Sequence, residues 1–385
     1  MPTELVRVIP KGAVQAWVER LIGQGEVIAP RRGPGGDEVF GTISRPEEVL
    51  WDFGNPLAPP KEFLLPQTEP LALIRREGGS MHVEPICDEE PRILLNLRSC
   101  DLTGIRFLEQ VLGQDIPDRA FLRRAESFTL VSLACTKPCP LGFCVCCGAG
   151  PFLGEGFDLQ LTDLGDVLLA EAGGSKGERL LEVGEGLFRA PTSEELERRV
   201  SLEEEALRSF GEITCHFGSA MRRISTRRVD ETVWAAMAPW CLGCGGCNLA
   251  CPTCYCFSVK DRSVQWAGKP GDGATDAGTR WKDPGEGDLG PSWVRCRTWD
   301  SCQYEAFTLE ASGHNPRADR AERMKRRFYH KVSAQYYQKD GVLGCVGCGR
   351  CIRVCMGTTD MPAVVEAIRK GAWEGAGVRE VALHV

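Results

Sequence analysis

The sequence lacks the features of a membrane or secreted protein. None of its apolar stretches approaches the roughly 20 residues needed to span a bilayer. Its first residues contain no apolar core between a basic start and a cleavage site, so we expect no signal peptide. A net charge of −7 gives no general attraction to nucleic acid or to an anionic membrane. We therefore expect a cytoplasmic protein that works without either.

Catalytic and nucleotide-binding motifs are also missing. No Ser/His/Asp set, GxGxxG loop or Walker loop occurs, and GPGGDE at 33–38 lacks the strand-then-helix context of a dinucleotide site. The five histidines are scattered. We interpret His216, His314 and His330 as surface or hydrogen-bonded groups rather than metal ligands. No substrate active site is evident.

Cysteine, by contrast, is abundant, with 20 in 385 residues. They cluster in short-spaced groups, and neighbours such as Cys146 and Cys147, or Cys254 and Cys256, are poorly placed for a disulfide framework. This pattern indicates reduced thiols that bind metal.

Two runs, CLGCGGCNLACP and CVGCGRCIRVC, share the C-x2-C-x2-C-x3-C spacing of ferredoxins. The first three cysteines of such a run surround one iron–sulfur cube, and in two-cluster ferredoxins the fourth binds the other cube. Met356 follows the second run where proline is usual. Zinc is the less favoured alternative, because zinc ribbons rarely use this spacing. The sequence therefore predicts two [4Fe–4S] clusters, one held by Cys241, Cys244, Cys247 and Cys355 and the other by Cys345, Cys348, Cys351 and Cys251.

A further group follows two expected strands in the N-terminal part. Cys100 lies in RSCD, and five more cysteines occupy CTKPCPLGFCVCCGAGP at 135–151. Open α/β sheets bind ligands at the carboxyl ends of their strands, which favours a metal site here. Buried free thiols are the alternative. We predict a third [4Fe–4S] cluster that uses Cys100, Cys135, Cys144 and Cys146 and leaves Cys139 and Cys147 spare.

The remaining cysteines are less informative. For Cys254, Cys256, Cys296 and Cys302 we prefer structural thiols over an additional cluster. Cys87 and Cys215 are interpreted as inert.

The predicted fold class is α+β, with an N-terminal mixed α/β domain (1–229) followed by an α-helical dicluster ferredoxin-type domain (230–385). Apolar runs at 92–98 and 128–135 with a helical pattern between them indicate a βαβ unit. We expect short strands and turns over 157–193 and a charged, solvated helix from Ser193, its N-cap, to residue 210.

In the C-terminal part, a Gly-, Pro- and Asp-rich segment at 266–292 predicts a long surface loop. A helix is expected over 315–339. For its basic side chains we leave three roles open: a solvated face, an acidic docking partner, or compensation of cluster charge. They are Arg317, Arg320, Arg323, Lys325, Arg326, Arg327 and Lys331.

Five motifs follow one another over about residues 90–370: RSCD, DIPDRAFLRR, the cysteine loop ending in GAGP, CPTCYCF and RTWDSC. Together they resemble the iron–sulfur beta subunit of cytoplasmic NiFe sulfhydrogenases, and equally the iron–sulfur subunit of anaerobic sulfite reductase. The adjacent Cys146 and Cys147 and the 266–292 loop depart from that pattern.

The resemblance implies an electron-transfer subunit. It would stand between a diaphorase subunit, which contains flavin and uses NAD(P)H, and a catalytic oxidoreductase subunit of a hydrogenase or of another reductase. A redox-inactive metal-binding scaffold is the alternative of a different class.

Overall fold

The computed structural model describes residues 5–77, 80–211, 215–263 and 292–375. The loop expected at 266–292 lies outside these residues, except for Ser292, which begins a strand. Within the described ranges, no helix is both long and apolar enough to cross a membrane.

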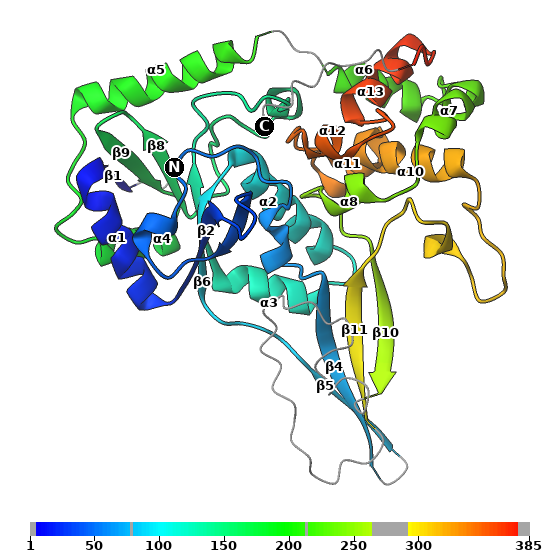
Figure 1. The fold of residues 1–385 in the computed structure, drawn as a ribbon, viewed down its shortest axis with the longest axis horizontal. Helices are drawn as coiled ribbons and strands as arrows, with labels where there is room; N and C mark the ends of the chain where they lie inside the picture. Colours follow the sequence, from blue (N-terminus) through cyan, green and yellow to red (C-terminus); the bar gives the residue numbers. More distant parts are fainter. Residues whose placement is uncertain (1–4, 78–79, 212–214, 264–291, 376–385) are drawn as a thin grey trace.

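A seven-stranded sheet forms the centre of the N-terminal part (Figure 1). Its strands are β1 (Leu5–Pro10), β2 (Glu26–Arg32), β3 (Glu38–Thr42), β6 (Arg92–Leu97), β7 (Phe128–Leu133), β8 (Leu159–Asp163) and β9 (Val167–Ala172). They run in the order β1-β9-β8-β7-β6-β2-β3. The four inner strands β8, β7, β6 and β2 are parallel to one another, and the expected βαβ unit is present as β6 and β7.

Helices cover both faces of this sheet, because residues along each strand alternate between two cores. Leu95 belongs to the core with α1 (Lys11–Gln24) and α4 (Ser175–Val183). Its neighbour Leu94 belongs to the core with α2 (Ser99–Gly113) and α3 (Arg119–Ser127). α2 begins at the carboxyl end of β6, which places Cys100 in its first turn.

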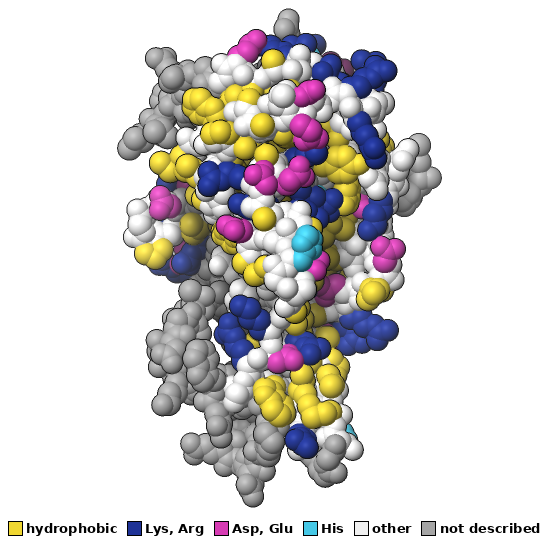
Figure 2. All heavy atoms as spheres, turned by 90° about the vertical axis from the view of Figure 1, so that its right-hand side faces the viewer, with side chains coloured by type: hydrophobic (Ala, Val, Ile, Leu, Met, Phe, Trp, Pro, Cys, Tyr) yellow, Lys and Arg dark blue, Asp and Glu magenta, His cyan; other side chains and the backbone are white. Residues whose placement is uncertain are grey.

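A second, four-stranded sheet joins the two halves of the sequence and projects away from the first (Figure 1). It runs β10-β11-β4-β5, all antiparallel, with strands β4 (Thr68–Glu77), β5 (Ser80–Pro85), β10 (Phe257–Ser263) and β11 (Ser292–Trp299). Apolar side chains are visible on the surface of the lower part of the molecule in Figure 2. In this sheet, the side chains of Met81, Val83 and Val259 are exposed. The boundary predicted at 229/230 therefore separates strands that belong to one sheet.

The C-terminal part packs short helices around a third core that contains Trp234, Met324, Phe328 and Ile368. Short 3-10 helices also occur along the described chain: η1 (Pro46–Glu48), η2 (Pro60–Phe63), η3 (Cys144–Cys147), η4 (Ala238–Trp240) and η5 (Glu305–Thr308). The remaining α-helices are α5 (Ser193–Ser209), α6 (Phe217–Ser225), α7 (Glu231–Met237), α8 (Gly246–Leu249), α10 (Arg320–Val332), α11 (Ala334–Asp340), α12 (Arg350–Val354) and α13 (Met361–Lys370). Helices and strands together confirm the α+β class.

Three local expectations were wrong. The stretch after β9 forms α4 instead of strands, because Leu180 and Leu181 face the core together on a helix. Thr192, one residue before Ser193, caps α5 through a capping box with Glu195. The helix expected over 315–339 is two helices, because the Ser333 side chain caps the start of α11.

Candidate metal centres

The two cysteine runs have the same backbone shape. Gly243 and Gly347 occupy equivalent motif positions with φ of +67° and +64°, and Gly245 and Gly349 follow at +73° and +77°. Glycine adopts these left-handed angles without a Cβ penalty, so each run can turn sharply before its short helix, α8 or α12. α8 and α12 contact each other. This contact brings the last cysteine of each run close to the other run.

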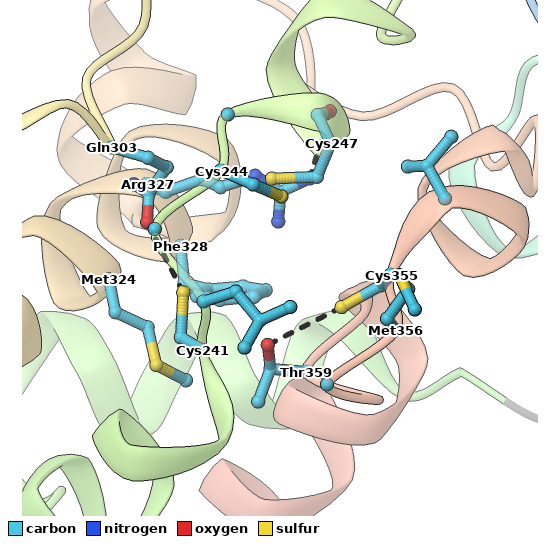
Figure 3. A pocket seen from close by; sticks show the side chains of 15 residues that line it. Cys241, Cys244, Cys247, Gln303, Met324, Arg327, Phe328, Cys355, Met356 and Thr359 are labelled. Atoms are coloured by element: carbon cyan, nitrogen blue, oxygen red, sulfur yellow. Dashed lines mark hydrogen bonds between the residues drawn. The ribbon is translucent and has the colours of Figure 1, made fainter.

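The first cavity lies at the start of run one (Figure 3). Cys355, at the end of the second run, faces the cavity opposite the cysteines of the first run. The Cys241 thiol lies 3.8 Å from Gln303 Oε1, and Cys355 Sγ lies 3.5 Å from Thr359 Oγ1. The structure thus brings together the four cysteines that the sequence assigns to one cube: Cys241, Cys244, Cys247 and Cys355.

The second cavity is lined by the other four cysteines of the two runs. Its walls include Phe143, Gly344, Arg327 and Lys331. The empty spaces, which are partly open to solvent, are about 440 Å³ in the first cavity and about 330 Å³ in the second. No three His, Cys, Asp or Glu side chains of the described residues are arranged around a single ion. The cysteines that line this second cavity are Cys251, Cys345, Cys348 and Cys351.

Burial sets the acidity of these thiols. It raises the pKa of Cys348 to about 12 and that of Cys247 to about 11. Cys251 and Cys345 are exceptions. A hydrogen bond from Cys254 and the nearby cations Lys331 and Lys61 hold the pKa of Cys251 well below the usual value, and a hydrogen bond from Cys147 lowers the pKa of Cys345. In the first cavity Cys244 is exposed. Thiols are the soft donors that hold iron–sulfur clusters, and eight of them line these two cavities.

Three buried cations of α10 accompany the cavities. Arg323, Arg327 and Lys331 follow one another at four-residue spacing and are 7%, 4% and 3% exposed. Lys331 Nζ donates to Thr253 Oγ1 at 2.7 Å and to Thr253 O at 3.0 Å. Lys325, by contrast, pairs with Glu231 at the surface. Of the roles left open for this basic segment, compensation of thiolate charge fits Arg327 and Lys331, which line the cavities.

The third cysteine group is only partly as expected. Burial raises the pKa of Cys144 to about 12, and the thiols of Cys135 and Cys139 add to the shift. Burial likewise raises the pKa of Cys100, which lies close enough to Cys135 to interact with it. Cys146 instead lines a surface cavity together with Cys215 and His216. Cys139, expected to be spare, interacts electrostatically with Cys135 and Cys144.

Cys147 and the other spare thiols occupy varied positions. Cys147 lies against Cys345, and hydrogen bonding between the two raises the pKa of Cys147. Cys302 accepts hydrogen bonds from Asn248 Nδ2 (3.0 Å) and Gln303 Nε2 (3.6 Å). A hydrogen bond from Cys256 has the largest effect on Cys302, and with these two amides it lowers the pKa of Cys302 to about 5.

Apart from Cys215 and His216 at the surface cavity of Cys146, the remaining cysteines and histidines are scattered over the described residues. Cys296 lies in β11, Cys215 is buried and Cys87 is half-buried. Of the histidines, His330 Nε2 hydrogen-bonds the Tyr255 hydroxyl at 3.2 Å. His216 precedes α6 and His314 is exposed in a loop.

Comparison with known proteins agrees with this geometry. Residues 240–277 and 279–359, which contain all eight cysteines of the two runs, match the 4Fe-4S dicluster domain, which supports [4Fe–4S] clusters in this segment. Over 333 residues, 86% of this chain and 89% of the relative, the sequence is 28% identical to sulfhydrogenase 2 subunit beta of Pyrococcus furiosus. This confirms the predicted resemblance to an iron–sulfur beta subunit.

Proposed function

We propose that this protein is the iron–sulfur electron-transfer subunit of a hydrogenase-type complex. The observation that carries the proposal is the crossed composition of the two cavities, each lined by three cysteines of one run and the fourth of the other. When bound, each [4Fe–4S] cluster accepts and releases one electron. The chain's own residues supply the thiolates, exclude water and hold the clusters in fixed positions.

The proposed partners are a flavin-containing NAD(P)H diaphorase subunit on one side and a catalytic hydrogenase-like subunit on the other. Support comes from the name of the relative, a subunit of a sulfhydrogenase, which matches over most of both chains. Electrons would pass between these partners through the clusters, and the substrate reaction would occur on the catalytic subunit.

We further propose a third [4Fe–4S] cluster at the end of β6. Its ligands are Cys100, Cys135, Cys144 and, in place of Cys146, Cys139. Cys135 contributes to the raised pKa of each of the other three thiols, and Cys139 contributes to that of Cys144, which supports the set. Burial raises the pKa of Cys139, and the nearby positive charges of Arg98 and Arg350 offset part of that increase.

Anaerobic purification, iron and sulfide analysis, and EPR spectroscopy after dithionite reduction test the proposal. Four iron atoms per cluster predict roughly 12 per chain for three clusters and roughly 8 for two. Zinc without reducible iron would disprove electron transfer and leave a metal-binding scaffold.

Single substitutions then test the ligands. Cys139→Ser should remove about four iron atoms per chain, because a hydroxyl is a poor iron ligand. Cys146→Ser, the matched control in the same loop, should retain them. The reverse result would restore Cys146 as the ligand. A large subunit that co-purifies with the chain and contains nickel would support the hydrogenase-type complex, whereas sirohaem would indicate sulfite reduction.

A further inference from the structure

One cation lies between the two cavities. Arg327 of α10 lines both the first cavity and the second, and its side chain is buried. In Figure 3 its guanidinium group lies beside Cys244 and Cys247. Lys331, one turn further along α10, lines the second cavity and not the first. Arg327 thus reaches both groups of cysteines.

The hydrogen bonds of Arg327 fix its position without neutralising its charge. Nε donates to Asn248 Oδ1 at 3.0 Å and Nη2 to the carbonyl oxygen of Cys247 at 3.4 Å. Nη1 is buried and has no hydrogen-bond partner among the described residues. Both groups that accept from Arg327 are neutral oxygens. Burying a cation without a counter-charge is costly, so a negative charge is expected to accompany it in the working protein.

The neighbouring buried arginines differ from Arg327 in their surroundings. Arg350 is paired with Asp101, Nη1 to Oδ1 at 2.6 Å. Arg323 is bound to backbone oxygens, including that of Gln303 at 3.0 Å, and lines neither cavity. The groups that act on Arg327 are thiols from both runs, Cys247 and Cys351 foremost, which raise its pKa against the effect of burial.

We propose that Arg327 is the shared electrostatic group of the two clusters: its fixed positive charge raises the reduction potentials of both. Each one-electron reduction adds one negative charge to a cavity. A cation close to both cavities stabilises either reduced state, and more so the state in which both clusters are reduced. The inference rests on the proposed function, because it requires clusters in both cavities.

The test is an EPR-monitored redox titration of the full-length, iron-loaded protein. Arg327→Gln should lower both potentials, with at least a tenfold change in each reduction equilibrium, which is about 59 mV for a one-electron couple. Arg327→Lys retains the charge and should recover most of the shift.

Arg323→Gln is the matched control, one turn earlier on the same helix and similarly buried. It should shift both potentials less than Arg327→Gln. Equal shifts in the two variants, or a shift confined to one cluster, would overturn the proposal. Protein without iron would instead refute the proposed function.

If Arg327→Gln fails to retain iron, Asn248→Asp provides a second route. Its carboxylate has the shape of the native amide and would neutralise the guanidinium from the position that Asn248 Oδ1 occupies. Both potentials should fall at full iron content. Unchanged potentials in this variant would contradict the proposal.

Discussion

At the scale of single residues, the pKa of His330 reflects its burial and the positive charges on α10. Burial, followed by the cations Lys331 and Arg326, lowers its pKa to about 3. In the unfolded chain the pKa is about 6.5, so between that value and pH 3 only the unfolded state takes up the proton. Folding stability from this residue is therefore complete above about pH 6.5 and falls by about 1.4 kcal/mol per pH unit toward pH 3.

His330→Gln should remove this acid sensitivity, because glutamine does not titrate. Urea unfolding of iron-loaded protein at about pH 7.5 and about pH 5.5 measures it. We expect the wild type to lose about 1 kcal/mol more than the variant between these values. Equal losses would show that His330 is protonated in the folded protein.

The sequence could predict the two four-cysteine sets, because the run spacing itself groups three cysteines and separates the fourth. For the third cluster the sequence favoured Cys146 over Cys139, whereas the folded chain supports the proposal of Cys139. That choice depends on how η3 orients consecutive residues, which spacing does not encode. The buried role of Arg327 was also left open, although its four-residue spacing from Arg323 and Lys331, beside apolar neighbours, already indicated an inward face.

At the scale of elements, the second run packs against the loop of the third cysteine group. A Cβ on Gly347 would lie 2.5 Å from Phe143 O and 2.6 Å from Cys144 Cα. The equivalent Gly243 of the first run has nothing nearer than 3.8 Å. Although the two glycines have almost the same φ, only Gly347 closely approaches a neighbouring backbone.

This difference predicts unequal effects of the same substitution. Gly243→Ala should cost about 1–2 kcal/mol from its left-handed backbone alone. Gly347→Ala should cost about 1–3 kcal/mol more because of the clash, and iron content should fall. Denaturant unfolding and iron analysis of both variants provide the measurement. Similar losses in the two would mean that the loop moves aside without cost.

The element pattern also explains where secondary-structure prediction succeeded and where it failed. The strands β6 and β7 could be found because continuous apolar runs are typical of parallel strands buried on both faces. The period of apolar residues indicated α2, but it did not reveal the break between α10 and α11. A serine such as Ser333 fits either within a helix or at its start, so only the folded chain decides between the two.

At the scale of the whole molecule, the two cysteine-rich parts are joined by polar contacts as well as by the shared sheet. Asn55 Nδ2 donates to the carbonyl oxygen of Cys348 at 2.7 Å, and Arg353 Nη1 donates to Asn55 O at 2.7 Å. Contacts between residues so far apart in the chain leave no signal in a single sequence. A boundary drawn from composition alone, such as 229/230, therefore cannot show how firmly the two parts are connected.

The most deeply buried of these connections is the ion pair between Asp101 of α2 and Arg350 of α12. Both side chains are fully buried, and two hydrogen bonds of 2.6 and 3.1 Å join them. Asp101→Ala would leave an unpaired buried guanidinium, so we expect a loss of about 3–5 kcal/mol in the free energy of unfolding. The double variant Asp101→Leu, Arg350→Met removes both charges and should lose less than the single variant.

Guanidinium chloride unfolding of the iron-loaded protein measures these differences. Glu109→Ala is the control, because Glu109 pairs with Arg106 on the same helix but in a more exposed position. It should cost no more than about 1 kcal/mol. If Asp101→Ala costs no more than this control, water reaches the joint between α2 and α12, and the two parts of the molecule are held together by the shared sheet and the clusters instead.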